Sequence, residues 1–189
     1  MDVWEAVNGR RAIRKYKNTP IERAALQRLI DAAAMAPSTM NSQPWHFHIV
    51  QGPQRDAIVK ILNRSTLMIA DLFTEMDEEH VEMATHFFSN CGDAPAIIVV
   101  SSPMAEGDEY KRLVDLIGCG CSIQNLMLAA QSEGLGTCVL TISFWVSEDI
   151  RKFLKIEGRD VVCCVLVGEP DQAPVAPPRR ANIIDWIGG

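Results

Sequence analysis

Residues 108–140 read DEYKRLVDLIGCGCSIQNLMLAAQSEGLGTCVL and contain the longest periodic segment of the sequence. From Asp108 to Ser132, apolar side chains recur at helical spacing and cover most of the circumference. A helix that is apolar nearly all round lies inside a fold or in a dimer interface. Gly118 and Gly120 each cost about 1 kcal/mol of helix stability relative to alanine. We therefore expect another backbone to pack closely against this part of the helix.

Shorter elements are predicted on both sides of this helix. Gly134 is a natural end for it, and Val161–Gly168 shows no polar alternation, so this last strand should be central and buried on both faces. Asp2 and Glu5 match a capping box, and Thr19 matches a cap followed by proline. The predicted elements are a short helix from Asp2, a helix that starts at Thr19-Pro20 and stops by Ala36, strands over 45–51, 96–101, 136–140 and 161–168, and helices over 53–62, 67–90 and, capped by Ser147, 147–155.

Composition limits the class of protein. The 189 residues suit a single domain spanning 1–189, and neither a linker nor an internal repeat divides them. The net charge of −6 disfavours general nucleic-acid binding, because phosphate backbones select basic proteins. No apolar run in the sequence reaches membrane-spanning length, and the N-terminus lacks the pattern of a secretory signal. We expect a cytoplasmic protein that binds neither nucleic acid nor membrane.

Basic residues gather at both ends of this acidic chain. Five of the 18 lysines and arginines lie within Arg10–Lys17, and Arg179 and Arg180 follow a proline-rich stretch. Because arginine binds phosphate through paired, planar hydrogen bonds, the two clusters are candidates to converge on one anionic group. The alternative is a solvated turn between helices. A GxGxxG fingerprint and a Walker-type loop are both missing, so any phosphate must be held by arginines.

Other constellations point to structure rather than chemistry. The six cysteines form no C-x-x-C pair and are expected to be reduced and buried, with a redox disulfide as the alternative. His46 and His48 share a strand face, but no cysteine or carboxylate with ligand spacing stands nearby, so no metal site is predicted. Gly-x-Ser-x-Gly is absent, which leaves serine hydrolysis without support. The aromatic side chains expected in the core or lining a pocket are those of Trp45, Phe87, Phe88, Phe144 and Trp145.

The C-terminal tail is proline-rich at first and then apolar, ending in Ile183-Ile184-Asp185-Trp186-Ile187. Exposing such side chains to water is costly. The simplest interpretation is an arm that packs on another subunit. The alternative is that the tail folds back on the core of its own chain.

Four segments resemble the motifs of the nitroreductase family, in the family's order and over essentially the whole chain. The second of them is long and specific. They are Arg10–Tyr16, similar to the opening Arg-Arg-Ser-x-Arg-x-Phe; Ala36–Phe47, similar to the second motif; Gln124–Ala130 with Gly134–Cys138, similar to the core helix and following strand; and Val167–Pro170 with Pro177–Arg180, similar to the last strand and C-terminal arm.

The resemblance implies an α+β, nitroreductase-like fold with a central mixed β-sheet flanked by helices. It implies an interlocked homodimer with exchanged C-terminal arms and one FMN at each side of the interface. The implied activity moves hydride from NADH or NADPH through flavin N5 to a small organic acceptor such as a nitroaromatic or a quinone. The flavin carries that chemistry, so no catalytic side chain is expected. The alternatives are a flavin-binding storage or redox-sensing protein without turnover, or a specialised relative such as a reductive dehalogenase or a flavin-fragmenting enzyme.

The same resemblance assigns cofactor-binding roles to individual residues. The phosphate and ribityl chain would contact Arg10, Arg11, Ala12 and Arg14, and the phosphate would also contact Arg179 and Arg180. Flavin contacts, some from the second subunit, would come from Pro37, Ser38, Asn41 and Gln43, and backbone amides near flavin N5 from Leu140 and Thr141.

The sequence also departs from the family pattern in three places. Ala12 replaces the usual serine, which removes one hydroxyl donor to the phosphate. The segment 139–145 lacks the glycines often found after this strand. The segment 63–91, where the choice of substrate is expected to reside, matches nothing specific.

Overall fold

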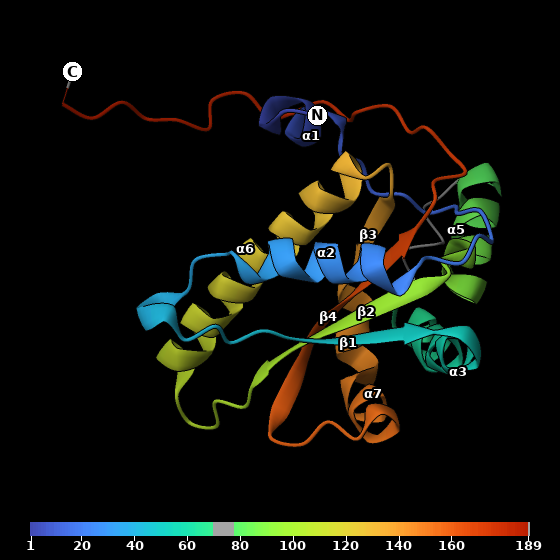
Figure 1. Ribbon diagram of the computed structural model, residues 1–189, viewed down its shortest axis with the longest axis horizontal. Coiled ribbons are helices and arrows are strands. Elements are labelled where there is room, and N and C mark those ends of the chain that lie inside the picture. Colours follow the sequence, from blue (N-terminus) through green and yellow to red (C-terminus); the bar gives the residue numbers. More distant parts are fainter. Residues whose placement is uncertain (70–77, 189) are drawn as a thin grey trace.

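The computed structural model describes residues 1–69 and 78–188. It is an α+β fold in which helices pack on both faces of one four-stranded sheet (Figure 1). The strands, in the order β1-β2-β4-β3, are β1 (His46–Gln51), β2 (Ala96–Pro103), β4 (Arg159–Gly168) and β3 (Gly136–Leu140). The α-helices are α1 (Val3–Gly9), α2 (Arg23–Ala34), α3 (Gly52–Asn63), α5 (Glu78–Asn90), α6 (Glu109–Ser132) and α7 (Ser147–Leu154), and the 3₁₀ helices are η1 (Thr39–Asn41), η2 (Arg64–Ile69), η3 (Cys91–Asp93) and η4 (Thr141–Val146).

The hydrogen-bonded neighbours in this sheet are antiparallel, so the prediction of a mixed sheet is wrong for the four strands. The reason lies in the connections. The long crossover through α6 does make β3 run in the same direction as β2. However, β4 inserts between them and runs opposite to both. The one parallel pairing in the described chain is an isolated bridge between Ala12 and Thr137.

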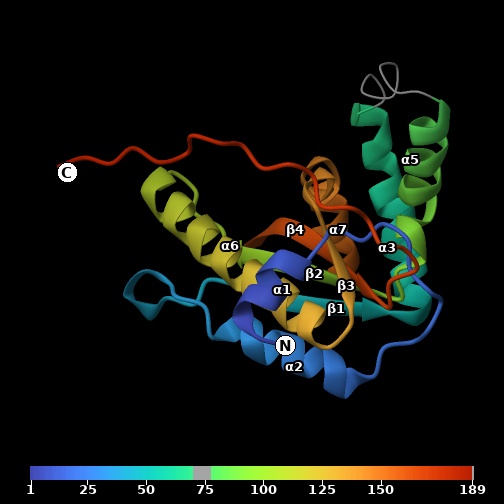
Figure 2. The ribbon, with the colours of Figure 1, turned by 90° about the horizontal axis from the view of Figure 1, so that it is seen from above.

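Two apolar cores lie on the two faces of the sheet. Alternate residues of β2 and β4 point to opposite sides, as the pleat of a strand requires. Ile97 and Val99 join the core under α3 and α7, whereas Ile98 and Val100 join the core under α2 and α6. Seen from above, α2 and α7 lie on opposite sides of the sheet (Figure 2). The prediction that Val161–Gly168 forms a central, buried strand is confirmed, because β4 has a neighbour on each side.

The long helix α6 has one buried and one exposed apolar face. Ser122 and Leu126 are completely buried against α2 and the sheet. Gly118 permits the close approach of Pro44, whose Cγ lies 3.3 Å from the position that a Cβ would take. Apart from the helix's own backbone, no atom of residues 1–69 and 78–188 comes within 4 Å of the corresponding position at Gly120. The helix is long and apolar enough to cross a membrane, but its packing identifies it as a core helix.

Two helix caps differ from the prediction. The side chain of Asp2 does cap α1 in a capping box with Glu5. In contrast, α2 begins at Arg23, three residues after the predicted start, because Glu22 and not Thr19 occupies the N-cap position, without a side-chain capping bond. Ser147 is the first residue of α7 and not its cap, since η4 runs directly into this helix.

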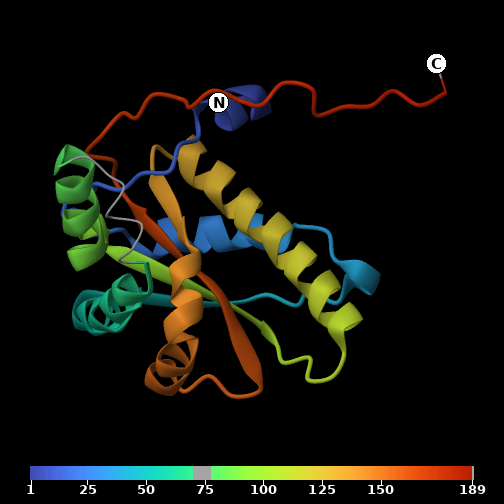
Figure 3. The same ribbon diagram turned by 180° about the vertical axis from the view of Figure 1, so that it is seen from behind.

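The start of the C-terminal tail is held by the basic segment. Lys17 N–H donates to the carbonyl of Glu169, and Asp171 N–H donates to the carbonyl of Lys15, both at 2.9 Å. Ion pairs Lys15–Asp171 (2.9 Å) and Lys17–Glu169 flank these bonds. Beyond Asp171 the tail leaves the body in an extended course, and its end lies far from the sheet (Figures 1 and 3).

Candidate functional site

The arginine segment lies beside β3. Ile13 N–H donates to the carbonyl of Thr137 at 2.9 Å, and Ala12 pairs with Thr137. The approach is close enough that a Cβ at Gly136 would stand 2.6 Å from Ile13 Cγ1, so only glycine fits there. Arg10 and Arg14, on either side of this contact, act electrostatically on Cys138 in β3. The segment is therefore a fixed neighbour of the sheet and not a solvated turn.

Arg11 carries a buried hydrogen-bond donor without an acceptor. Its Nη1 donates to the carbonyls of Asn8 (2.6 Å) and Arg10 (2.8 Å), but its Nε is buried and has no partner. Within the described residues, no carboxylate forms an ion pair with Arg10, Arg11 or Arg14. An unpaired buried donor of this kind is costly unless a ligand satisfies it. Three unpaired arginines and one orphaned donor fit a phosphate.

Leu140 and Thr141 lie at the far end of β3. A strand rises about 3.3 Å per residue, so they stand about 10 Å or slightly more from the Thr137 bridge. Leu140 is buried, whereas Thr141 is exposed as the first residue of η4. The hydroxyl of Ser143 donates to the carbonyl of Leu140 at 2.8 Å and fixes the turn. The arginine segment and this turn thus mark two ends of a single strand, which suits an elongated ligand.

The loop 37–43 is tightly bent. Met40, Asn41 and Gln43 all have positive φ angles, of 53°, 54° and 44°. Gln43 N–H donates to Ser38 Oγ (2.9 Å), and Gln43 Nε2 donates to Asn41 Oδ1 (3.2 Å). Pro37, Asn41 and Gln43 are exposed. Positive φ angles are uncommon in non-glycine residues. Where they do occur, they are often found in segments that clamp a ligand.

This loop and the arginine segment are far apart in one chain. The loop packs at Gly118 of α6 through Ser38, while Gly9, next to Arg10, approaches Gln131 of the same helix. Thirteen residues of helix separate these contacts, which corresponds to about 20 Å. The two groups lie at opposite ends of α6 in Figures 1 and 3. A single chain does not bring them together.

Arg179 and Arg180 do not meet the arginine segment either. Both are exposed in the extended tail, and so are Ile183, Trp186 and Ile187. The tail therefore does not fold back over the core of its own chain. On α6 a second apolar surface is exposed, formed by Tyr110, Leu113, Leu116 and Ile117.

The buried cysteines are inert thiols. The six are free, and five of them are buried, as predicted; Cys121 is half-buried. Burial raises the pKa of Cys91 to about 12, of Cys119 to about 11 and of Cys163 to about 12. These thiols stay protonated at neutral pH and are poor nucleophiles.

The two histidines of β1 lie close together, with ring centroids 4.7 Å apart. His48 Nε2 lies 3.0 Å from Ser101 Oγ. Burial, with His46 and Arg159 nearby, lowers the pKa of His48 to about 4. In the described part of the chain, no group of three or more histidine, cysteine or carboxylate side chains is placed to hold a metal.

The aromatic residues divide between the interior and the surface. Trp45 and Phe87 are buried as expected. Phe144 and Trp145 are 59% and 54% exposed and form an edge-to-face pair, so they lie outside the core of this chain. In the three-residue period of η4, Ser143 and Val146 face inward and the two rings face out.

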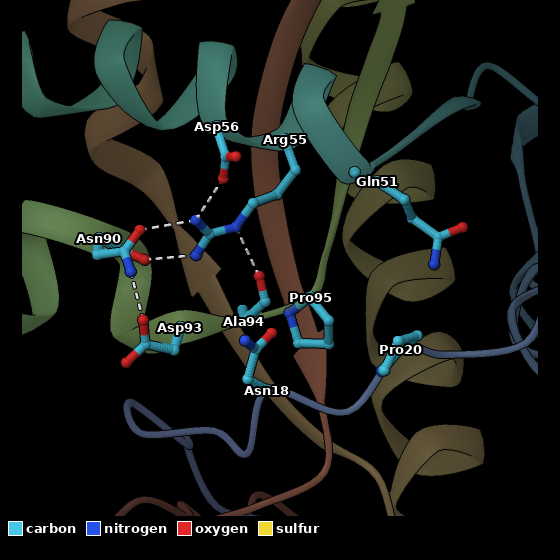
Figure 4. A pocket seen from close by; sticks show the side chains of 10 residues that line it. Asn18, Pro20, Gln51, Arg55, Asp56, Asn90, Asp93, Ala94 and Pro95 are labelled. Atoms are coloured by element: carbon cyan, nitrogen blue, oxygen red, sulfur yellow. Dashed lines mark hydrogen bonds and ion pairs between the residues drawn. The ribbon is translucent and has the colours of Figure 1, made fainter.

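A cavity of about 530 Å³ lies at the start of α3 and contains none of the sequence-predicted site residues (Figure 4). Arg55 is one of the residues that line the cavity, and it makes several hydrogen bonds there. Its guanidinium donates to Ala94 O (2.8 Å), Asn90 O (2.6 Å), Asn90 Oδ1 (2.6 Å) and Asp56 Oδ1 (3.0 Å). With its nitrogens already bonded, Arg55 links α3 to the end of α5 and to Ala94, in the segment between η3 and β2. No sequence pattern around Arg55 marks it as buried.

Solved structures with the same fold include flavoproteins. A BluB-like flavoprotein from Clostridium difficile 630 superposes with a TM-score of 0.77 at 24% identity, covering 99% of both chains. The FMN-dependent nitroreductase NfnB from Mycobacterium smegmatis, solved in complex with NADPH, gives a TM-score of 0.74 at 19% identity, covering 95% of this chain and 97% of that one. At these identities the likeness establishes the fold.

Sequence comparison identifies the family as well as the fold. The 4-nitrobenzoate reductase of Pseudomonas putida is 28% identical over 196 aligned positions, covering 90% of this chain and 86% of that protein. The family model for the nitroreductase family matches residues 7–169, which include the arginine segment, the loop 37–43 and all four strands. The chain belongs to the nitroreductase family.

Proposed function

We propose that the protein is an FMN-dependent oxidoreductase that transfers hydride from NADH or NADPH to a small organic acceptor such as a nitroaromatic or a quinone. The observation that carries this proposal is the buried, unpartnered Nε of Arg11, in a segment with three unpaired arginines beside β3. The named activities of the relatives support it: one reduces 4-nitrobenzoate, and another is FMN-dependent and binds NADPH.

In this proposal Arg10, Arg11 and Arg14 hold the FMN phosphate, and the half-buried Ala12 lies beside the phosphate at the end of the ribityl chain. Leu140 and Thr141 present their backbone amides to the flavin edge at the other end of β3. The cofactor, when bound, supplies the two-electron chemistry. The protein's part is to bind and orient it, and its cationic groups favour negative charge on the reduced ring. No side-chain acid or base is required.

The proposal also needs a second subunit. The loop that contains Pro37, Ser38, Asn41 and Gln43 contacts α6 about 20 Å from the point where the arginine segment contacts it. These four residues would therefore contact the flavin bound by the partner subunit. Arg179 and Arg180 would reach the phosphate from an arm exchanged with the partner subunit. The exposed apolar face of α6 would form the centre of the homodimer. Each subunit would be one domain spanning 1–189, working in the cytoplasm.

The test is turnover by the reconstituted protein. The protein is loaded with FMN, and oxidation of NADH and of NADPH is followed with 4-nitrobenzoate and with a quinone as acceptors. Acceptor-dependent oxidation that is lost in Arg11→Met and kept in Arg23→Met supports the proposal. FMN binding without oxidation of either nicotinamide would favour a storage or sensing protein, or a specialised relative with a different reaction.

A further inference from the structure

A half-buried arginine at the start of β4 spans three parts of the fold. Arg159 Nη2 donates to the carbonyl of Ser101 at 2.9 Å and to the carbonyl of Pro44, and its Nε donates to Ser101 Oγ at 3.1 Å. Ser101 lies in β2, while Pro44 directly follows Gln43. One guanidinium therefore fastens the loop 38–44 to two strands of the sheet.

The partners of this cation are neutral oxygens. Within the described residues, Arg159 forms no ion pair with a carboxylate; Asp115 acts on it only from a distance. Removing a guanidinium from water without a paired anion is costly. The hydrogen bonds of Arg159 to the two carbonyls must therefore have good geometry to offset the loss of hydration. A lysine at this place would have a single nitrogen, so it could not keep the Nε bond to Ser101 Oγ together with the Nη2 bonds to the two carbonyls.

The sheet is irregular at the point where Arg159 binds. The register between β2 and β4 shifts between Val100 and Ser101, so that Val100 pairs with Cys163 but Ser101 pairs with Val161. Such bulges re-aim side chains and are frequent beside functional sites. Arg159 itself pairs with Pro103 at the end of the sheet, and its side chain runs back to Ser101.

The loop that Arg159 holds needs external support. Met40, Asn41 and Gln43 keep positive φ angles that non-glycine residues seldom adopt, and such conformations persist only when surrounding contacts impose them. Inside the loop, the amides of Asn41 and Gln43 both donate to Ser38, at 3.1 and 2.9 Å. Ser38 and Pro44 rest against Gly118, and the Arg159 bond adds a polar fastening to that apolar contact.

We propose that Arg159 is a positioning residue for the flavin: it holds the loop 38–44 in its bent conformation so that Asn41 and Gln43 are preorganised to contact the ring. This inference rests on the proposed function. Arg159 itself does not touch the flavin in this account; it acts through Pro44 and the backbone of the loop. Preorganisation lowers the cost of ordering a loop on binding.

The first experiment measures hydrogen exchange of backbone amides in the flavin-free protein. Arg159→Met and Arg159→Lys are compared with Arg151→Met, a matched control whose half-buried arginine bonds Glu148 at 3.0 Å and does not contact the loop. We expect the amides of Asn41 and Gln43 to exchange about tenfold faster in both Arg159 variants, because one charged hydrogen bond is lost. Amides of β4 in the Arg159 variants, and the amides of Asn41 and Gln43 in Arg151→Met, should keep their wild-type rates.

The second experiment titrates FMN into the same proteins. We expect the dissociation constant to rise about tenfold in the Arg159 variants and to stay unchanged in Arg151→Met. The inference is overturned if the loop amides of both Arg159 variants exchange at wild-type rates. It is also overturned if the amides of β2 and β4 exchange faster by the same factor as those of the loop. Failure of the wild-type protein to bind FMN instead overturns the proposed function, and the exchange data still decide whether Arg159 orders the loop.

Discussion

The amide of Ile13 donates a hydrogen bond of 2.9 Å to the carbonyl of Thr137, and this contact joins the arginine segment to β3. It places Arg11 and Arg14 on either side of a fixed point on the sheet. The strand then leads, about 10 Å further on, to Leu140 and Thr141. The spacing between the arginines proposed to bind the phosphate and the residues proposed to contact the flavin edge is therefore set by a β-strand, which is a rigid element.

Replacing Arg11 by methionine should weaken FMN binding without weakening the fold. In the free protein the substitution loses the Nη1 bonds to the carbonyls of Asn8 and Arg10, but it also removes a buried Nε that has no partner, so the net cost to the folded state is small. In the complex it would lose a charged hydrogen bond, and we expect the dissociation constant to rise roughly 10- to 100-fold. Fluorescence titration measures the constant, and thermal unfolding of the free protein measures stability. Arg23→Met, on the exposed start of α2, should change neither quantity.

Ala12→Ser should strengthen FMN binding. Ala12 stands where the family pattern has serine, and its backbone is already held by the bridge to Thr137. An added hydroxyl would give the phosphate one more donor, so we expect about a three- to tenfold lower dissociation constant. The exposed Ala24 provides the control variant Ala24→Ser. An unchanged or higher constant for Ala12→Ser would show that the phosphate is not bound beside residue 12.

Ile117→Asp should dissociate the proposed dimer. Ile117 is 60% exposed on the free apolar face of α6, so a single chain tolerates aspartate there. Burying an unpaired carboxylate in a subunit interface is strongly unfavourable. Sedimentation velocity should show dimers for the wild type and for Thr85→Asp on α5, but monomers for Ile117→Asp. A monomeric wild-type protein would remove the second subunit from the account.

The buried thiols should make the fold sensitive to alkali. Because burial raises the folded-state pKa of Cys91 and Cys163 to about 12, their contribution to stability is complete below the unfolded pKa near 9. It is lost as the pH rises from about 9 towards 12. Urea unfolding followed by circular dichroism should show that the free energy of unfolding decreases over that pH range. In the double variant Cys91→Ala/Cys163→Ala this decrease should be smaller.

Local patterns predicted most elements of this fold. The apolar period of α6, the boundaries of β3 and the capping box of Asp2 depend on neighbouring residues only, and all three are confirmed. Contacts from distant segments decided the exceptions. Thr19 does not cap α2, whose N-cap position is Glu22; the segment that contains Thr19 follows Lys17, which is bound to Glu169 about 150 positions away in the sequence. The direction of strands also escaped prediction, since nothing local shows that β4 inserts between β2 and β3.

The candidate site could be predicted only in part for the same reason. Motifs predicted the arginine segment, the loop 37–43 and the turn at Leu140 as parts of the site, and the resemblance placed some flavin contacts on a second subunit. The separation of about 20 Å along α6 between the loop and the arginines came only from the structure. No sequence motif marked Arg159 as part of the site. Its role depends on its reaching Pro44 across β2, which is a tertiary contact between residues 115 positions apart.

The central claim is that this chain holds FMN and reduces it with a nicotinamide. The most direct test is an absorbance spectrum of the FMN-reconstituted, desalted protein, recorded anaerobically before and after addition of NADH and then NADPH. The account predicts flavin absorbance that stays with the protein and bleaches with at least one nicotinamide. Flavin that is lost on desalting, or that bleaches with neither, would contradict it.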